Sequence, residues 1–411
     1  MDPAPSTRLE PGRASDGEAA PRLLIAANVP STVGAFLVPY AEHFRARGWR
    51  VDVATHGPSQ DARVAAAFDE VHHVPWTRRP TDPVNMTTAV RAVRELVARE
   101  RYDLVHVHDP VASFVTRFAL RRARAAGRVK VIYTAHGFHF FRGNAPHRNL
   151  VFRGLERLAA AWTDYLVVIN QEDLAAARGF PVAGEVVYMP GIGVDTSRYD
   201  PVAVSDEEVA RVRADLGLGP EQKLLLFVAE LNPGKRHRDA VEALARTGRS
   251  DIVLACAGVG PLAKQIAEQA SRLGLGDRVH LLGYRDDVQA LLRAAFALVL
   301  PSEREGLPRC LMEASCLERP VIATRIRGTT ELVKDGATGL LVDVGDVDGL
   351  AAAIVSLADD PDRAEAMGTL GREAMRRFDL AHVMALHDEL YAKALASDGV
   401  DDTTDRAHSD Q

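Results

Sequence analysis

Short apolar runs alternate with longer segments in which apolar residues recur at helical spacing along most of the chain. The runs have the length of buried strands. They are residues 23–27, 50–54, 71–74, 104–108, 129–134, 165–169 and 186–189 in the first half, and 223–229, 252–257, 279–282, 295–300, 320–324 and 339–342 in the second. Strands that alternate with helices form parallel sheets covered by helices on both faces. The pattern therefore predicts an α/β fold with two doubly wound, Rossmann-like domains.

Breaks in this rhythm mark the expected domain boundaries. Glycine and proline cluster between Pro190 and Pro201, which is typical of an interdomain linker. Both ends of the chain are polar and lack periodicity, which is typical of disorder. The predicted divisions are a disordered tail at 1–21, a domain at 22–190, a linker at 191–220, a second domain at 221–377, a last helix at 378–396 and a disordered tail at 397–411.

The stretch from Ala295 to Ala314 carries the strongest chemical signal. A buried strand is followed by a short polar loop, and a helix opens near Pro308, where the missing N–H costs nothing. In an open parallel sheet this junction is where ligands bind, and the free N–H groups of a helix start suit a diphosphate. Glu305 in the loop and Glu313 in the helix can then face different parts of one ligand. The layout suggests a nucleotide-sugar site.

Glu305 and Glu313, eight positions apart with Gly306, Leu307 and Pro308 between them, resemble the signature of the retaining GT-B glycosyltransferases of family 4. The resemblance implies two domains facing across a cleft, with the last helix crossing back to the first domain. It also implies Glu313 on the ribose hydroxyls, Glu305 on the donor hexose, and the backbone of residues 306–308 near the nucleotide-sugar. Retention of anomeric configuration is implied as well.

In the first domain, His136 and Gly137 directly follow a strand and match the family's His-Gly pair, which contacts the donor sugar from the opposite domain. His136 is therefore a predicted catalytic residue. The family usually has two adjacent glycines after the first strand, and here Val33 precedes Gly34, so close approach to the donor is expected only at Gly34. His108 at a strand end is either a ligand contact or a polar residue satisfied by backbone.

In the second domain, Lys235 matches a family lysine and is predicted to neutralise the leaving diphosphate. Family members commonly have an arginine where Glu230 stands, and Arg236 is the candidate to replace it. Gly258 follows a strand in a loop that permits close backbone approach, and Arg285 lies in a segment that resembles the family's base-proximal loop. Both are predicted to bind the nucleotide-sugar.

The composition of the chain excludes several classes of partner and cofactor. The 411 residues are 47% hydrophobic and carry a formal charge of −6, which argues against a nucleic-acid partner. Three cysteines without a CxxC pair indicate neither a disulfide framework nor a zinc site, and no Asp-x-Asp motif lies on a site loop, so we expect no metal and no cofactor. No apolar run reaches the roughly 18 to 20 residues that span a bilayer. These features predict a cytoplasmic protein.

One basic segment stands out in this acidic chain. Eight Lys or Arg residues and no Asp or Glu lie between Arg117 and Arg148. Two interpretations are open. The segment forms a surface that contacts anionic lipid or an acceptor diphosphate, or it is an ordinary solvated helix face. Phe138, Phe140 and Phe141 are correspondingly either core or an exposed apolar lip.

The resemblance favours transfer of a hexose or N-acetylhexosamine from a UDP-sugar to a polyprenyl-diphosphate-linked acceptor at the inner face of the cytoplasmic membrane. A small soluble acceptor is the alternative. A non-hydrolysing sugar-nucleotide epimerase and a non-catalytic nucleotide-sugar-binding protein share the architecture but fit the signature less well. A dehydrogenase would need Gly-x-Gly-x-x-Gly after its first strand, and residues 28–34 lack it.

Overall fold

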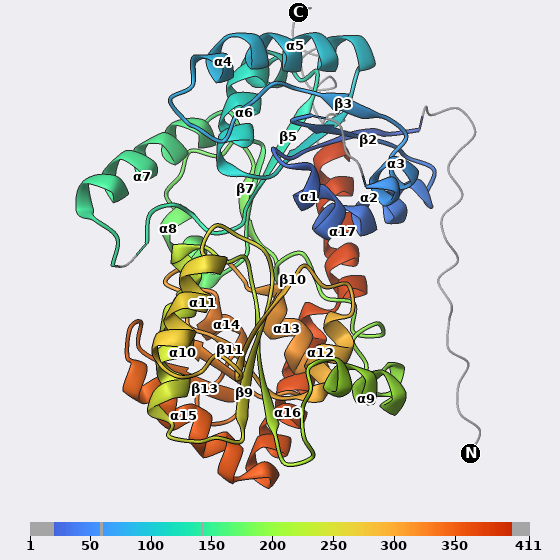
Figure 1. The fold of residues 1–411 in the computed structure, drawn as a ribbon. Coiled ribbons are helices and arrows are strands. Elements are labelled where there is room, and N and C mark those ends of the chain that lie inside the picture. The colour runs from blue at the N-terminus through green and yellow to red at the C-terminus, as the bar shows by residue number, and fades with distance from the viewer. Residues whose placement is uncertain (1–19, 58–60, 142, 397–411) are drawn as a thin grey trace, which may run out of the picture.

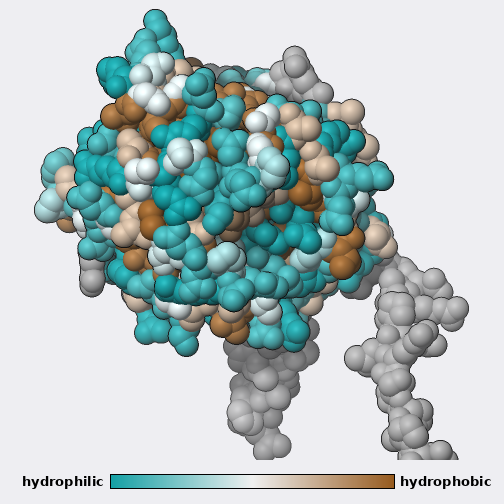
Figure 2. Space-filling view, turned by 60° about the horizontal axis from the view of Figure 1, so that its bottom comes forward, coloured by the Kyte–Doolittle hydropathy of each residue, from teal (hydrophilic) through white to brown (hydrophobic). Residues whose placement is uncertain are grey.

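The structure is a computed structural model that describes residues 20–57, 61–141 and 143–396. It contains two α/β domains, one above the other in Figure 1, joined by two chain crossings. The tails predicted at the two ends lie outside the described residues, apart from Ala20 and Pro21. On the face that Figure 2 shows, with the C-terminal domain turned forward, hydrophilic residues predominate and hydrophobic ones form small separate patches.

The N-terminal domain is built on a seven-stranded sheet in the order β3-β2-β1-β4-β5-β6-β7, in which each strand runs parallel to its neighbours. Its strands are β1 (Arg22–Ala26), β2 (Arg50–Thr55), β3 (Val71–His73), β4 (Leu104–Val107), β5 (Lys130–Ala135), β6 (Tyr165–Val168) and β7 (Glu185–Tyr188). Its helices are α1 (Pro30–Thr32), α2 (Val38–Arg45), α3 (Ala62–Ala67), α4 (Pro83–Met86), α5 (Thr88–Glu100), α6 (Pro110–Ala125), α7 (Pro146–Ala160) and α8 (Gln171–Ala177).

The C-terminal domain has a six-stranded parallel sheet in the order β10-β9-β8-β11-β12-β13. The strands are β8 (Lys223–Val228), β9 (Ile252–Ala257), β10 (Val279–Gly283), β11 (Ala295–Leu300), β12 (Val321–Thr324) and β13 (Gly339–Val342). Its helices are α9 (Asp206–Asp215), α10 (His237–Arg246), α11 (Ala263–Arg272), α12 (Val288–Ala294), α13 (Arg309–Cys316), α14 (Thr329–Leu332), α15 (Val347–Asp359) and α16 (Pro361–Met375). The last helix, α17 (Leu380–Ala396), follows this domain in the chain.

The apolar runs form the strands because both faces of each sheet are covered. Leu24 and Ile25 of β1 are buried in different core clusters, one on each side of the sheet. Strands buried on both faces read as continuous apolar runs. In each sheet the order reverses beside the first strand of the domain, and this switch point is where ligands bind in open α/β sheets. The predicted fold class, two Rossmann-like domains, is confirmed.

The entry to the first helix differs from the prediction. The expected loop through Gly34 is shorter, because helical turns begin at Pro30, whose fixed φ and missing N–H suit a first turn. A π-helical turn over Val33–Leu37 then leads into α2.

The segment expected as a linker contains a helix. Ser205 caps α9 through a capping box, and Val212 of α9 packs in the core of the C-terminal domain. The chain crosses between the domains at Val194 and returns at Asp379, and these two residues pair. Beyond the return, α17 packs against the N-terminal domain, where Tyr391 is fully buried (Figure 1).

Candidate active site

Glu305 lies in the loop after β11 and is paired with a lysine. It is only 9% exposed and accepts a hydrogen bond from Lys235 Nζ at 2.7 Å. Lys235 follows β8, and Asn232 fixes its short turn by accepting from the Lys235 N–H. A cavity of about 250 Å³ lies beside Glu305 and is lined by both domains, including Phe141 and Glu172 from the N-terminal one. Arg304 and Arg327 also line the cavity, so a ligand in it would meet acidic and basic groups together.

Glu313, inside α13, is 8% exposed and is held by two partners. Arg309 Nε lies 2.9 Å from its Oε1, and Tyr199 from the interdomain segment is its hydrogen-bond partner. Burial raises the pKa of Glu313, while the charge of Arg309 opposes that rise. Arg309 also donates to the Ala35 carbonyl of the N-terminal domain at 2.6 Å. The helix start that carries Glu313 is therefore tied to both domains.

The two domains meet backbone to backbone at Gly306. A Cβ built there would lie 1.9 Å from the His136 carbonyl oxygen, so only glycine fits this approach. Gly137, with φ at +111°, lies on the opposite side of the contact. Gly328 also packs closely on Gly306, because a Cβ on Gly328 would lie 2.3 Å from the Gly306 carbonyl oxygen. The predicted His-Gly pair of the first domain thus lies directly against the predicted Glu305–Gly306 loop of the second.

The His136 ring is oriented by a second histidine. His108 Nδ1 lies 2.9 Å from His136 Nε2, and one ring donates to the other. Burial lowers the pKa of both imidazoles, although Asp109 opposes this for His136. Neutral rings can share one N–H hydrogen bond in a fixed tautomeric arrangement. His108 therefore contacts a predicted site residue, whereas the sequence left its role open.

A buried ion pair joins the domains beside this contact. Arg327 Nη1 lies 2.7 Å from Asp173 Oδ1, and their side chains are 5% and 1% exposed. Arg327 also donates to the Phe138 carbonyl at 2.8 Å. The sequence did not single out either residue for the site. The two residues are 154 positions apart, and no local sequence pattern indicates that they are in contact.

The other predicted site residues lie as follows. The Leu307 side chain packs against Gly191, and Pro308 is the buried residue before α13. A Cβ on Gly34 would meet the Asp61 carboxylate at 2.5 Å, and one on Gly258 would meet the Ala229 carbonyl oxygen at 1.9 Å, so both glycines allow close packing within their own domains.

Two predicted cations are paired with carboxylates other than Glu305 and Glu313. Arg236 pairs with Asp239 at 2.6 Å and with Glu303 at 2.9 Å. Arg285 pairs with Asp287 at 2.5 Å. The structure thus brings Lys235, Glu305, Gly306 and the His136 backbone to one place. Arg309 is the arginine that contacts both Glu313 and the opposite domain.

Of the two alternatives for the phenylalanines, core or exposed apolar lip, the lip is wrong for two of the three residues. Phe138 and Phe140 are 1% and 7% exposed and stack at 4.7 Å in the core, so the alternative that they are core is correct. The basic segment is also partly internal. Arg117 is fully buried against Glu156 at 3.0 Å, and Arg124 pairs with Asp164 at 2.9 Å. Arg142 lies outside the described residues.

Metal-ligand side chains gather elsewhere in the described part of the chain. Asp52, Glu70 and His72 lie within reach of one another near the amino ends of β2 and β3, the end of the sheet opposite the site. Arg50 and the Tyr102 hydroxyl already bond Asp52, at 2.9 and 2.5 Å. None of the helices described in the structure has the length and apolar character needed to cross a membrane.

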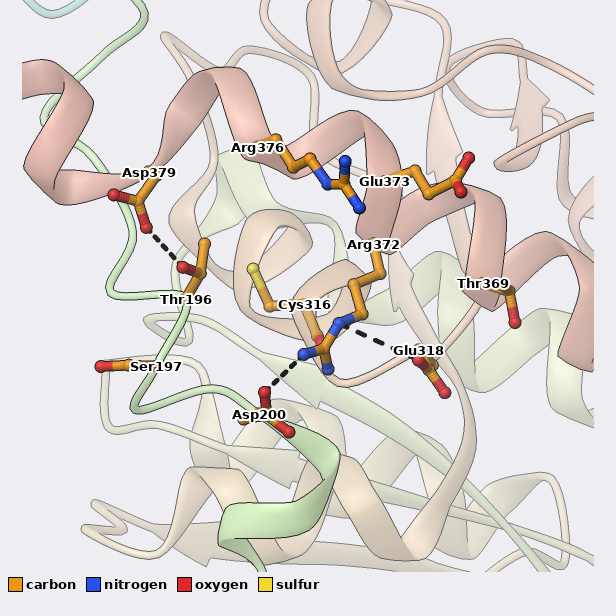
Figure 3. Close-up of a pocket in the computed structure, with 10 residues that line it drawn as sticks. All are labelled: Thr196, Ser197, Asp200, Cys316, Glu318, Thr369, Arg372, Glu373, Arg376 and Asp379. Atoms are coloured by element: carbon orange, nitrogen blue, oxygen red, sulfur yellow. Dashed lines mark hydrogen bonds and ion pairs between the residues drawn. The ribbon is translucent and has the colours of Figure 1, made fainter. Parts of the chain in front are cut away.

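A further cavity of about 530 Å³ lies beside the two chain crossings, between residues 196–200 and α16 (Figure 3). Arg372 of α16 reaches across it to Asp200 at 2.5 Å, and Thr196 donates to Asp379. These contacts tie the two chain crossings to the C-terminal domain. None of the predicted site residues lines this cavity.

Two parallel-sheet domains that meet at the strand ends, with an acidic and basic site at the junction, define the class: a GT-B glycosyltransferase. Residues 33–198 match the family model described as Glycosyltransferase Family 4, and residues 209–374 match Glycosyl transferases group 1. Among curated relatives, EpsD of Bacillus subtilis (strain 168) is 34% identical over 381 residues, covering 92% of this chain and 98% of that one. The chain belongs to family 4 of the GT-B glycosyltransferases.

Other relatives agree with this assignment. UDP-Gal:alpha-D-GlcNAc-diphosphoundecaprenol alpha-1,3-galactosyltransferase of Escherichia coli is 29% identical over 294 residues, covering 70% of this chain and 74% of that one. The crystal structure of Anabaena HepE in complex with UDP and glucose matches the fold with a TM-score of 0.75, at 22% identity and over 90% of this chain and 99% of that one. The chain is accordingly an enzyme that transfers a glycosyl group.

Proposed function

We propose that the enzyme transfers a hexose or N-acetylhexosamine from a UDP-sugar to a polyprenyl-diphosphate-linked sugar, with retention of configuration, at the inner face of the cytoplasmic membrane. The observation that carries the proposal is the junction itself. Gly306 lies between Glu305, which pairs with Lys235, and the start of α13, and it meets the His136–Gly137 backbone of the other domain. The UDP in the HepE structure and the lipid-linked substrate in the name of the Escherichia coli relative support the choice of donor and acceptor.

In this proposal Glu313 holds the ribose and Glu305 the donor hexose, as in the family. Lys235 and the N–H groups near the start of α13 stabilise the negative charge that develops on the leaving diphosphate. His136, neutral because its burial lowers its pKa, faces the donor sugar. Arg309, rather than Arg236, is the second cation near the nucleotide, because two carboxylates already hold Arg236.

The test is a transfer assay with the full chain, a panel of UDP-, GDP- and ADP-hexoses and N-acetylhexosamines, and a detergent-dispersed polyprenyl-diphosphate sugar. We expect one UDP-sugar to raise Tm and to yield a product with the donor's anomeric configuration. A product of inverted configuration, or transfer only to small water-soluble acceptors, would contradict the proposal.

We also propose that the reaction needs no metal, because Lys235 and the helix start supply the positive charge at the diphosphate. Activity after treatment with EDTA should equal that of the untreated enzyme. Loss of activity in EDTA that returns on adding Mg²⁺ or Mn²⁺ would show that a metal provides this charge instead.

A further inference from the structure

Helix α7 (Pro146–Ala160) stands out from the side of the N-terminal domain (Figure 1). Of its 15 residues only Ala159 and Ala160 are buried. Four of the eleven large hydrophobic side chains exposed in the described parts of the chain belong to it: Leu150 (76%), Val151 (58%), Leu155 (41%) and Leu158 (52%). At 3.6 residues per turn these four positions fall within an arc of about 140°. They form one apolar face that no described part of the chain covers.

A charge pair on the inner side of α7 orients the helix with this face outward. Glu156 lies on the opposite side of α7 and is turned into the domain, where it accepts from the fully buried Arg117 at 3.0 Å and from the Tyr133 hydroxyl at 3.3 Å. An ordinary surface helix buries its apolar stripe and exposes its charges. Here the acidic side chain is only 14% exposed while the leucines are 41–76% exposed, so the outward face is available to a partner.

The arginines of α7 indicate the chemistry of such a partner. Arg148, Arg153 and Arg157 are exposed on the flanks of the apolar arc, although the whole chain carries a charge of −6. A helix with an apolar face flanked by arginines suits the interface of an anionic bilayer. Two copies joined symmetrically through this face would instead bring like charges together.

A cavity of about 720 Å³ lies between α7 and the carboxyl ends of β1, β4 and β5, the edge of the sheet that the His136–Gly137 turn also follows. Phe152 and Leu155 of α7 line one part of it, and Asn28, Asp109 and His139, which follow β1, β4 and β5, line another. Most of the lining side chains are apolar, and the polar ones include Glu156 on α7 and Asn28, Asp109 and His139 at the strand ends. An amphiphilic acceptor can lie with its lipid towards α7 and its sugar towards the cleft.

We propose that the exposed face of α7, defined by Leu150, Val151, Leu155 and Leu158, docks on an anionic lipid bilayer and places this cavity at the bilayer surface. The use of the cavity rests on the proposed lipid-linked acceptor. Docking itself does not depend on the reaction.

Flotation of the full chain with vesicles tests the docking. Wild type should bind vesicles containing phosphatidylglycerol and bind pure phosphatidylcholine vesicles weakly. The double variant Leu150→Gln/Leu158→Gln should bind the anionic vesicles more than about a hundred-fold less tightly. The matched control Leu273→Gln/Leu370→Gln, at exposed leucines of α11's end and α16, should bind as wild type does. Both variants should keep the wild-type Tm, because all four side chains are exposed.

Charge is tested separately. Arg148→Gln/Arg153→Gln should weaken binding to anionic vesicles roughly thirty-fold, at about fivefold per basic residue, and leave binding to neutral vesicles unchanged. Wild type that floats with neither vesicle, or that forms a dimer which Leu150→Gln/Leu158→Gln dissociates, would overturn the proposal.

Activity separates this proposal from the proposed function. The variant Leu150→Gln/Leu158→Gln should transfer sugar to a short-chain, water-soluble acceptor analogue at the wild-type rate and to a vesicle-embedded acceptor far more slowly. If wild type floats with anionic vesicles but transfers to neither acceptor, the proposed function fails and docking stands. If wild type transfers to both acceptors without binding vesicles, docking fails and the function stands.

Discussion

Replacing Arg327 by methionine should loosen the contact between the domains. Methionine keeps much of the apolar stem but removes the guanidinium that bonds Asp173 at 2.7 Å and the Phe138 carbonyl at 2.8 Å. Asp173, 1% exposed, would retain only the Phe138 N–H at 3.1 Å and the Asn170 amide at 2.8 Å as donors. Removing one partner of a buried ion pair costs about 3–5 kcal/mol.

The protein can avoid part of this cost by separating its domains. If the domains open, water reaches Asp173 and part of the penalty for burying an unpaired carboxylate disappears. We therefore expect a loss of about 3 kcal/mol or less in the free energy of unfolding, with the remainder shown as a shift towards separated domains. The remainder is at most about 2 kcal/mol, and at 1.4 kcal/mol per factor of ten it changes that equilibrium roughly thirty-fold.

The loss should depend on pH in a defined direction. Burial raises the pKa of Asp173, and Arg327 opposes the rise, so removing Arg327 raises that pKa further. A carboxyl group whose pKa is higher in the folded state than in the unfolded state binds more protons when the protein is folded. The stability that protonated Asp173 contributes is therefore present at low pH and is lost as the pH rises through the folded-state pKa. The deficit of Arg327→Met relative to wild type should therefore be largest at neutral pH and shrink as the pH falls and Asp173 is protonated.

Urea unfolding followed by circular dichroism, together with the radius of gyration from X-ray scattering, measures both effects. Arg325→Met is the matched control, because Arg325 pairs with Asp335 while both are about half exposed, and such pairs contribute roughly 0–1 kcal/mol. If Arg327→Met is as stable as Arg325→Met at pH 7 and has an unchanged radius of gyration, the buried pair does not hold the domains together.

The remaining predictions concern the site. Gly306→Ala should fold normally but lose activity by roughly a hundred-fold, because its Cβ would force the His136 carbonyl away; Gly276→Ala, with no atom within 4 Å of its Cβ, should match wild type in Tm and kcat. Glu313→Ala should weaken UDP binding in calorimetry by roughly ten- to a hundred-fold, the contribution of hydrogen bonds to a charged group, whereas Glu305→Ala should mainly lower kcat. If Glu313→Ala binds UDP as tightly as wild type, the assignment of nucleotide binding to Glu313 and of turnover to Glu305 is wrong.

Local patterns determined the architecture of this protein. Strands buried on both faces must be apolar throughout, so the apolar runs located them to within a few residues. The 295–314 stretch indicated the ligand side of the second sheet, because a strand, a polar loop and a helix start occur there in succession. The family signature then indicated the class of enzyme, and the matching relatives confirm it.

Tertiary structure alone decided how charged and aromatic side chains are used. Arg117 belongs to a basic segment that the sequence presents as a surface, but packing of α7 on the domain buries it against Glu156 and turns the leucines of α7 outward. Asp173 and Arg327 become partners only because two domains close over them. Periodicity reflects the needs of one strand or helix, whereas the charge state, exposure and partner of a side chain depend on which distant segment lies against it.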